Sequence, residues 1–135
     1  MGKSIRQIAR EKAIIGIYQH LTVDASKKDI MNFVRSDDTL HPGQSGYEFC
    51  EWLVDTTLEN MDSYIALIDK YLKKGWRFER LGKMEAAILL VGTCELLESE
   101  LDPRIVINEA ILNAKAFCDD DAYKLINGVL HKVAE

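Results

Sequence analysis

The chain has 135 residues and a formal net charge of −5, so it is long enough to bury one substantial core but too acidic to coat nucleic acid by bulk charge. Its hydrophobic fraction of 47% is ordinary for a globular domain, and no apolar run approaches the ~20 residues that span a membrane. These values favour a single domain over residues 1–135 without a membrane partner. The N-terminus has basic residues but no apolar stretch typical of a signal peptide, so we expect a cytoplasmic location.

Helical periodicity runs through the whole sequence, and no stretch shows the strict alternation that is typical of a strand. In the first predicted helix, Ile14, Ile17 and Leu21 recur at the spacing of one helical face. The longest predicted loop covers residues 36–46, which include a proline and two glycines. The predicted helices cover about residues 4–21, 27–35, 47–60, 62–72, 78 or 82 to 99, and 120–134, with another that begins at Asp102–Pro103.

Capping residues suggest several of these helix boundaries. Residues 24–26 and Asp62–Ser63 are predicted N-caps. Asp102 followed by Pro103 is typical of a helix start, with Asn108 as a second possible start. Residues 73–75, two lysines and a glycine, indicate a helix end. The sequence therefore predicts an all-α fold, a compact bundle of about seven helices.

Asn127 and Gly128 fall inside the last predicted helix. Glycine in a helix interior costs about 1 kcal/mol relative to alanine, so a packing reason is expected. We predict that Gly128 permits the close approach of another helix.

The sequence offers no constellation for catalysis or for metal binding. The three cysteines, at positions 50, 94 and 118, are widely spaced and have no histidine at ligand spacing, which favours buried thiols in a reducing cytosol over a disulfide or a zinc site. The Asp119–Asp121 run suits the N-terminus of the last helix better than a magnesium site, because consecutive helical residues point in different directions. We therefore expect neither an enzyme nor a bound cofactor.

Positive charge is concentrated at the N-terminus. Lys3, Arg6 and Arg10 are spaced i, i+3 and i+7, so on a helix they form one stripe. Residues 1–12 contain four cations and one carboxylate, a balance of +3 in an acidic chain. The stripe is either a surface that follows RNA phosphates or an ordinary solvated helix face. Lys124, in the last predicted helix, either contacts phosphate or offsets the run of aspartates.

A set of short motifs in chain order resembles the NusB family. Each motif is weak alone, but their order and approximate spacing agree over nearly the whole chain. The motifs that carry the resemblance are Ala9-Arg10-Glu11-Lys12-Ala13, Ile17-Tyr18-Gln19, Met84-Glu85-Ala86-Ala87-Ile88-Leu89, Glu95-Leu96-Leu97, Pro103 followed by Val106-Ile107-Asn108-Glu109-Ala110, and Asn127-Gly128-Val129-Leu130.

The resemblance implies an all-helical protein that binds a short single-stranded RNA element, boxA, in leader transcripts of ribosomal RNA. It implies that NusE, a ribosomal small-subunit protein, is a partner, and that the complex helps RNA polymerase to ignore termination signals. The residues that match family RNA contacts are Lys3, Arg6, Arg10 and Lys124, and those that match the partner-protein side are Tyr18 and Glu85.

Two alternatives stay open at this point. Gln7 and Ile8 interrupt the basic arm, which in the family is often a run of consecutive arginines, so the chain could be a protein-only adaptor with weakened RNA binding. NusB-like modules also occur in some RNA methyltransferases, an arrangement that we do not expect here because the chain ends at Glu135.

Overall fold

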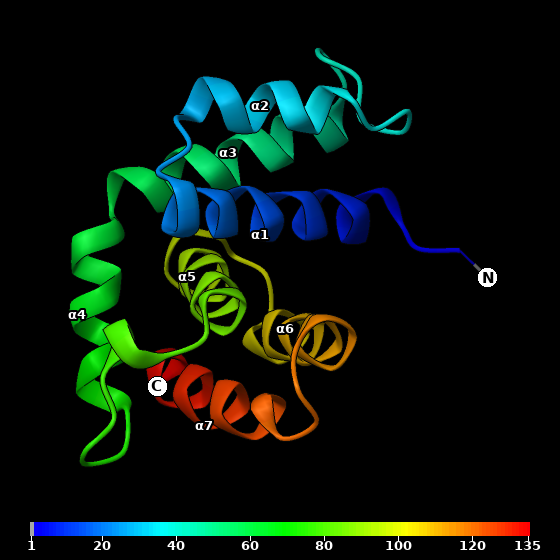
Figure 1. Cartoon of the computed structure of the whole chain (residues 1–135). Coiled ribbons are helices and arrows are strands. Elements are labelled where there is room, and N and C mark those ends of the chain that lie inside the picture. The colour runs from blue at the N-terminus through cyan, green and yellow to red at the C-terminus, as the bar shows by residue number, and fades with distance from the viewer. Residues whose placement is uncertain (1) are drawn as a thin grey trace.

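The computed structural model describes residues 2–135, and in that range it contains seven α-helices, one short 3-10 helix and no strand (Figure 1). The predicted all-α bundle of about seven helices is therefore confirmed. None of these helices is both long enough and apolar enough to cross a membrane. The elements are α1 (Ile5–Val23), α2 (Lys27–Arg35), α3 (Ser45–Glu59), α4 (Met61–Tyr71), η1 (Phe78–Arg80), α5 (Lys83–Glu98), α6 (Pro103–Phe117) and α7 (Ala122–Ala134).

Short polar side chains start three of the helices. Ser4 and Ser26 each accept a hydrogen bond from the backbone amide three residues later, and the side chain at that later position bonds back to the cap, which makes two capping boxes. Asp102 accepts a hydrogen bond from the Arg104 amide, with Pro103 in the first turn. Each cap satisfies an N–H group that the helix itself leaves free. These local bonds explain why α1, α2 and α6 begin close to where the sequence predicts.

The fourth helix begins within one residue of its predicted start, but two other capping predictions are wrong. Asp62 and Ser63 do not cap α4, because Asn60 both ends α3 and precedes α4. The Asn60 side-chain amide donates to the Thr56 carbonyl at 2.9 Å, and the Ser63 hydroxyl donates to the Asn60 carbonyl at 3.0 Å. Asn108 lies in the middle of α6 and is exposed, so it needs no capping role.

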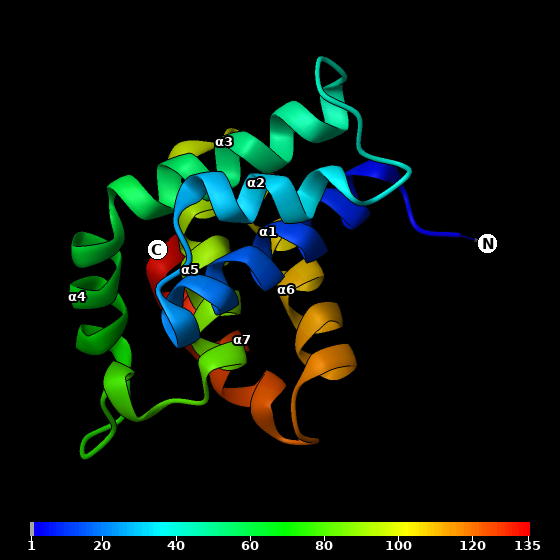
Figure 2. The same ribbon diagram turned by 45° about the horizontal axis from the view of Figure 1, so that its top comes forward.

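Helix α5 forms the centre of the bundle (Figure 1). Its residues Ala86–Glu95 are all buried, because the helix is apolar all round rather than along one stripe. Helix α1 packs against α5 and α3, while α6 and α7 pack on another side of α5 (Figure 2). The N-terminal turns of α1 therefore lie where α3, α5 and α6 can all reach them.

Helices approach closely at Gly16 and Gly92 rather than at Gly128. A Cβ atom at Gly16 would collide with Ile30 of α2, and one at Gly92 would lie 3.0 Å from Leu130 Cδ1 of α7. A Cβ atom at Gly128 would have no neighbour within 4 Å, and this glycine is exposed. The predicted close approach at Gly128 is therefore wrong, because α7 packs through a different face that includes Leu130.

The three cysteines are free thiols. Cys50 and Cys94 are buried, and desolvation raises their thiol pKa values to about 12 and about 11. Both thiols therefore stay protonated and unreactive at neutral pH. Cys118 is only half-buried, although desolvation followed by the Glu85 charge raises its pKa to about 11. The prediction of buried thiols holds fully for two of the three.

Candidate nucleic-acid interface

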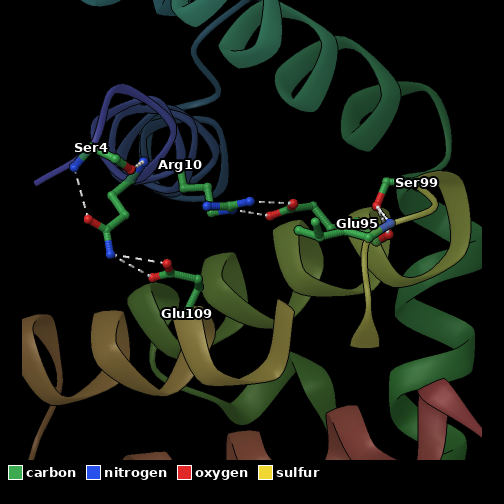
Figure 3. A network of polar contacts seen from close by, with 7 residues as sticks. Ser4, Arg10, Glu95, Ser99 and Glu109 are labelled. Atoms are coloured by element: carbon green, nitrogen blue, oxygen red, sulfur yellow. Dashed lines mark hydrogen bonds and ion pairs between the residues drawn. The ribbon is translucent and has the colours of Figure 1, made fainter. Parts of the chain in front are cut away.

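Arg10 points from α1 into the bundle and forms an ion pair with Glu95 of α5 (Figure 3). Its Nε lies 2.6 Å from Glu95 Oε1, and its Nη2 lies 3.1 Å from Glu95 Oε2. The two side chains are only 8% and 3% exposed. This bidentate pair joins α1 to α5 and neutralises the arginine, so Arg10 is not a free cation for a phosphate.

Arg6 precedes Arg10 on the same side of α1 and is exposed. Its guanidinium carbon lies 4.1 Å from the centroid of the Phe49 ring of α3, and Phe49 stacks in turn on Trp52 with ring centroids 6.2 Å apart. The Arg10 guanidinium approaches the same Phe49 ring at 5.3 Å. A cation–π contact orients Arg6 without cancelling its charge. The structure thus presents an oriented, solvent-accessible cation at this position.

Lys3 lies just before α1, because Ser4 is the N-cap, so the helical period does not set its position. It forms an ion pair with Glu11 while its own side chain remains 57% exposed. Within residues 2–135, Arg6 is therefore the one predicted arm cation without a carboxylate partner. The predicted single stripe is therefore wrong for Lys3, which lies outside the helix, and Arg10 is buried in an ion pair, so that only Arg6 keeps an exposed charge without a carboxylate partner in the described residues.

Gln7 interrupts the basic arm in the sequence, yet its side chain joins α1 to α6. Its Nε2 donates to both carboxylate oxygens of Glu109, at 3.1 and 3.2 Å, and its Oε1 accepts from the Ser4 amide at 3.0 Å. Sequence reasoning missed Glu95 and Glu109 as partners of α1, since they lie 85 and 102 residues from their bonded partners. One sequence feature could have indicated that Glu95 is buried and paired, because it is a carboxylate at the end of a long apolar run.

Lys124 belongs to a different surface, at the start of α7. It is 66% exposed, and its Nζ lies 3.4 Å from Asp121 Oδ1. Together with Trp76 it lines a groove between the end of α4 and α7. A second hollow, which also includes Trp76 and Asp121, is lined by Glu85. Lys124 and Glu85 therefore line adjoining hollows that share Trp76.

Tyr18 and Glu85, the two predicted partner-binding residues, lie on α1 and α5. Tyr18 is 36% exposed, and Glu85 is half-buried in the first turn of α5. Desolvation, and then the charge of Asp119, raises the pKa of the Glu85 carboxyl group. Both side chains reach the surface, and neither is bonded to the other in the described part of the chain.

The run Asp119–Asp121 neither caps α7 through a side chain nor forms a metal site. Asp121 occupies the N-cap position, but its side chain makes no capping bond and pairs with Lys124 instead. Over residues 2–135, no three His, Cys, Asp or Glu side chains are grouped so that they could hold a metal ion. The predicted capping by this run is thus wrong in its detail, because the Asp121 carboxylate is engaged by an exposed lysine.

Comparison with known proteins matches residues 7–135 to the NusB family model. Similar curated proteins include the transcription antitermination protein NusB of Exiguobacterium sp., 40% identical over 129 residues and 95% of each chain. The protein of the same name from Bacillus mycoides is 36% identical over 132 residues, which cover 96% of this chain and 97% of the relative. Among solved structures, T. maritima NusB has a TM-score of 0.82 at 26% identity, covering 99% of this chain and 92% of the other. A chain in the crystal structure of antitermination factors NusB and NusE in complex with dsRNA has a TM-score of 0.85 at 26% identity and 96% coverage of both chains.

Proposed function

This chain belongs to the NusB family, and on that premise we propose that it is a transcription antitermination factor that binds RNA together with NusE. The family is non-enzymatic. The relatives named above support the antitermination role, and the neighbouring complex of NusB, NusE and RNA supports the two partners. We further propose that the RNA is a boxA-type single-stranded element in ribosomal RNA leaders, and that the complex lets RNA polymerase read through terminators.

The observation that carries the RNA proposal is the exposed guanidinium of Arg6, held over the Phe49 ring at 4.1 Å. In this proposal Arg6 contacts an RNA phosphate directly. Lys3 contacts a second phosphate when its ammonium group leaves the ion pair with Glu11. Arg10 then acts as a positioning residue, because its charge is already used by Glu95. Lys124 contributes from the α7 surface, where it is 66% exposed.

For the protein partner, we propose that Tyr18 and Glu85 contact NusE. The Tyr18 side chain is exposed and the Glu85 side chain is half-buried, so both can be reached by a protein partner. Contact with a cationic group of NusE would favour the ionised Glu85, whose pKa is raised in the free chain by desolvation and by Asp119. NusE binding should therefore lower the pKa of the Glu85 carboxyl group relative to the free chain.

The second candidate is a protein-only adaptor of the same fold. The pairing of Lys3 with Glu11 and of Arg10 with Glu95 favours it, because two of the three arm cations already have carboxylate partners. RNA binding to the chain alone and with NusE, at several salt concentrations, separates the two candidates.

Arg6→Ala is the most direct test. A single-strand contact contributes a slope of about −0.7 to log affinity against log salt, so the variant should bind every RNA sequence more weakly and lose a little under one unit of slope. Arg104→Ala is the matched control, because Arg104 is an exposed arginine on α6. Single-stranded and duplex RNA should be compared side by side. Equal binding and equal slopes for the wild type and Arg6→Ala would favour the adaptor.

A further inference from the structure

Helix α6 is apolar on two sides, and the bundle covers only one of them. It packs against α5 and α7 through its buried residues, which are Val106, Ile107, Ala110, Asn113 and Ala114. A helix that is apolar on more than one side normally lies inside a protein. Both views place α6 instead at the edge of the bundle, on the side away from α4 (Figure 1 and Figure 2). The second apolar side of α6 therefore lacks the cover that its composition predicts.

The uncovered side of α6 is one nearly apolar row of side chains. Ile105, Asn108, Leu112 and Ala116 are spaced i, i+3, i+7 and i+11, so they share one helical face. All four are exposed. The row extends about 16 Å along the helix axis, which is the length of three turns. A second helix laid along α6 could therefore contact the whole row.

Two further exposed leucines stand at the N-terminal end of α6. Leu97, in the last turn of α5, is 46% exposed, and Leu101, just before α6, is 37% exposed. Ile105 and Leu112 are 48% and 49% exposed. Single exposed apolar residues are normal, but an aligned group of them marks a contact surface. These two leucines and the row on α6 are called the α6 face below.

Carboxylates border the α6 face at this same end. Glu98 and Glu100 are exposed, and neither takes part in the ion pairs found within residues 2–135. Residues 97–116 contain four carboxylates and two cations, a balance of −2. One of those cations, Arg104, already pairs with Asp102 at 2.9 Å. The α6 face is therefore acidic at one end, with two carboxylates available to a cation from outside the chain.

We propose that the α6 face is the docking surface for a basic amphipathic helix of another protein. Apolar side chains of that helix, spaced i, i+3 and i+7, pack on Ile105 and Leu112. Its lysines or arginines pair with Glu98 and Glu100. Amphipathic helices bind apolar surfaces in this way, with charges at the border that select the partner.

The charges on the α6 face favour such a helix over RNA or a second copy of this chain. A surface with a balance of −2 repels a polyanion. In a two-fold antiparallel pair of α6 helices, contact of Ile105 with Leu112 of the other copy brings the two Glu109 residues together. A parallel pair sets Glu98 and Glu100 against their own copies. Both arrangements place like charges side by side, whereas a basic helix meets opposite charges.

The α6 face lies apart from residues proposed above to contact NusE and RNA. Glu85 is in the first turn of α5 and Leu97 is in the last, which separates them by about 18 Å along the helix. Arg6 lies over the Phe49 ring of α3, not over α6. Docking at the α6 face therefore does not depend on the function proposed above.

A designed helical peptide tests the docking surface directly. The probe has about 18 residues, which form five turns, with leucines spaced i, i+3 and i+7 and arginines on the polar side. A charge-reversed peptide with glutamates in place of the arginines is its control. Each peptide is titrated into the full-length, isotope-labelled chain, and the backbone amide signals are followed by NMR. We expect the basic peptide to shift the signals of residues 97–116, and the charge-reversed peptide to leave them in place.

Matched variants identify the side chains that carry the binding. Ile105→Ser/Leu112→Ser should weaken binding of the basic peptide at least tenfold, because two apolar contacts are lost. Val23→Ser is the control, since Val23 is 74% exposed on α1 and lies outside the α6 face. Glu98→Gln/Glu100→Gln should weaken binding about fivefold at low salt and less at high salt. All these residues are exposed, so the midpoints of urea unfolding should stay near that of the wild type.

Three results would overturn the proposal. The first is that the basic peptide leaves residues 97–116 unshifted, or that the charge-reversed peptide binds equally well. The second is that the wild type self-associates in sedimentation experiments and the serine double variant does not, because a second copy would then cover the face. The third is that the serine double variant weakens binding of RNA or NusE, because the face would then belong to the function proposed above.

Discussion

Removal of the Arg10 guanidinium should destabilise the protein far more than removal of the Arg6 guanidinium. In Arg10→Ala the Glu95 carboxylate, 3% exposed, loses both of its hydrogen bonds and stays buried without a partner. Breaking a buried pair in this way costs about 3–5 kcal/mol. For a chain of this length that corresponds to a fall in Tm of about 10–18 °C.

Urea denaturation followed by circular dichroism measures this loss, with Arg6→Ala as the matched control. Arg6 is exposed and pairs with no carboxylate in the described chain, so its substitution should change the free energy of unfolding by less than about 0.5 kcal/mol. The double variant Arg10→Met/Glu95→Leu should recover most of the loss, because no buried charge then remains unpaired. The reasoning is refuted if Arg10→Ala unfolds within about 1 kcal/mol of the wild type, or if the double variant is less stable than Arg10→Ala.

Three further measurements test other parts of the structure. Gly128→Ala should raise the free energy of unfolding by about 1 kcal/mol, since its Cβ meets no atom within 4 Å. Gly16→Ala should lower it by about 1–3 kcal/mol through collision with Ile30, and equal effects at the two glycines would contradict the packing described for them. Asp102→Ala should lower the Tm at pH 7, because Arg104, through its side chain and backbone amide, holds the pKa of the Asp102 carboxyl below its usual range. That stabilisation is present above about pH 4 and is lost as the pH falls, so the two Tm curves should converge in acid; curves that stay parallel would disprove the link.

The helices could be predicted closely because their determinants are local. Ser4, Ser26 and Asp102 start their helices through bonds to amides two or three residues away. Apolar periodicity then extends each helix until a polar or glycine-rich stretch ends it. Prediction failed at Asp62 and Asn108, where a polar residue that could cap a helix simply faces solvent inside one.

The candidate site could be predicted only in part, because charge availability depends on distant residues. The spacing of Arg6 and Arg10 correctly places them on one side of α1, whereas Lys3 lies before that helix, and nothing local distinguishes the buried Arg10 from the exposed Arg6. Their difference arises from Glu95, 85 residues away from Arg10. The predicted close approach at Gly128 was wrong for the same reason, because the helices that pack against α7 determine which of its faces is buried.

The central place of α5 also constrains the order in which the protein can be completed during synthesis on the ribosome. Helix α1 emerges first, yet the groups that anchor it, Glu95 of α5 and Glu109 of α6, are translated 85 and 102 residues after the residues they bind. Until then α1 and α3 expose the apolar surface that α5 will cover. The nascent N-terminal half should therefore remain sensitive to protease and attractive to chaperones until most of the chain has left the exit tunnel. The bonds that fix the N-terminal turns of α1 to α5 and α6 would then form only when synthesis is nearly finished.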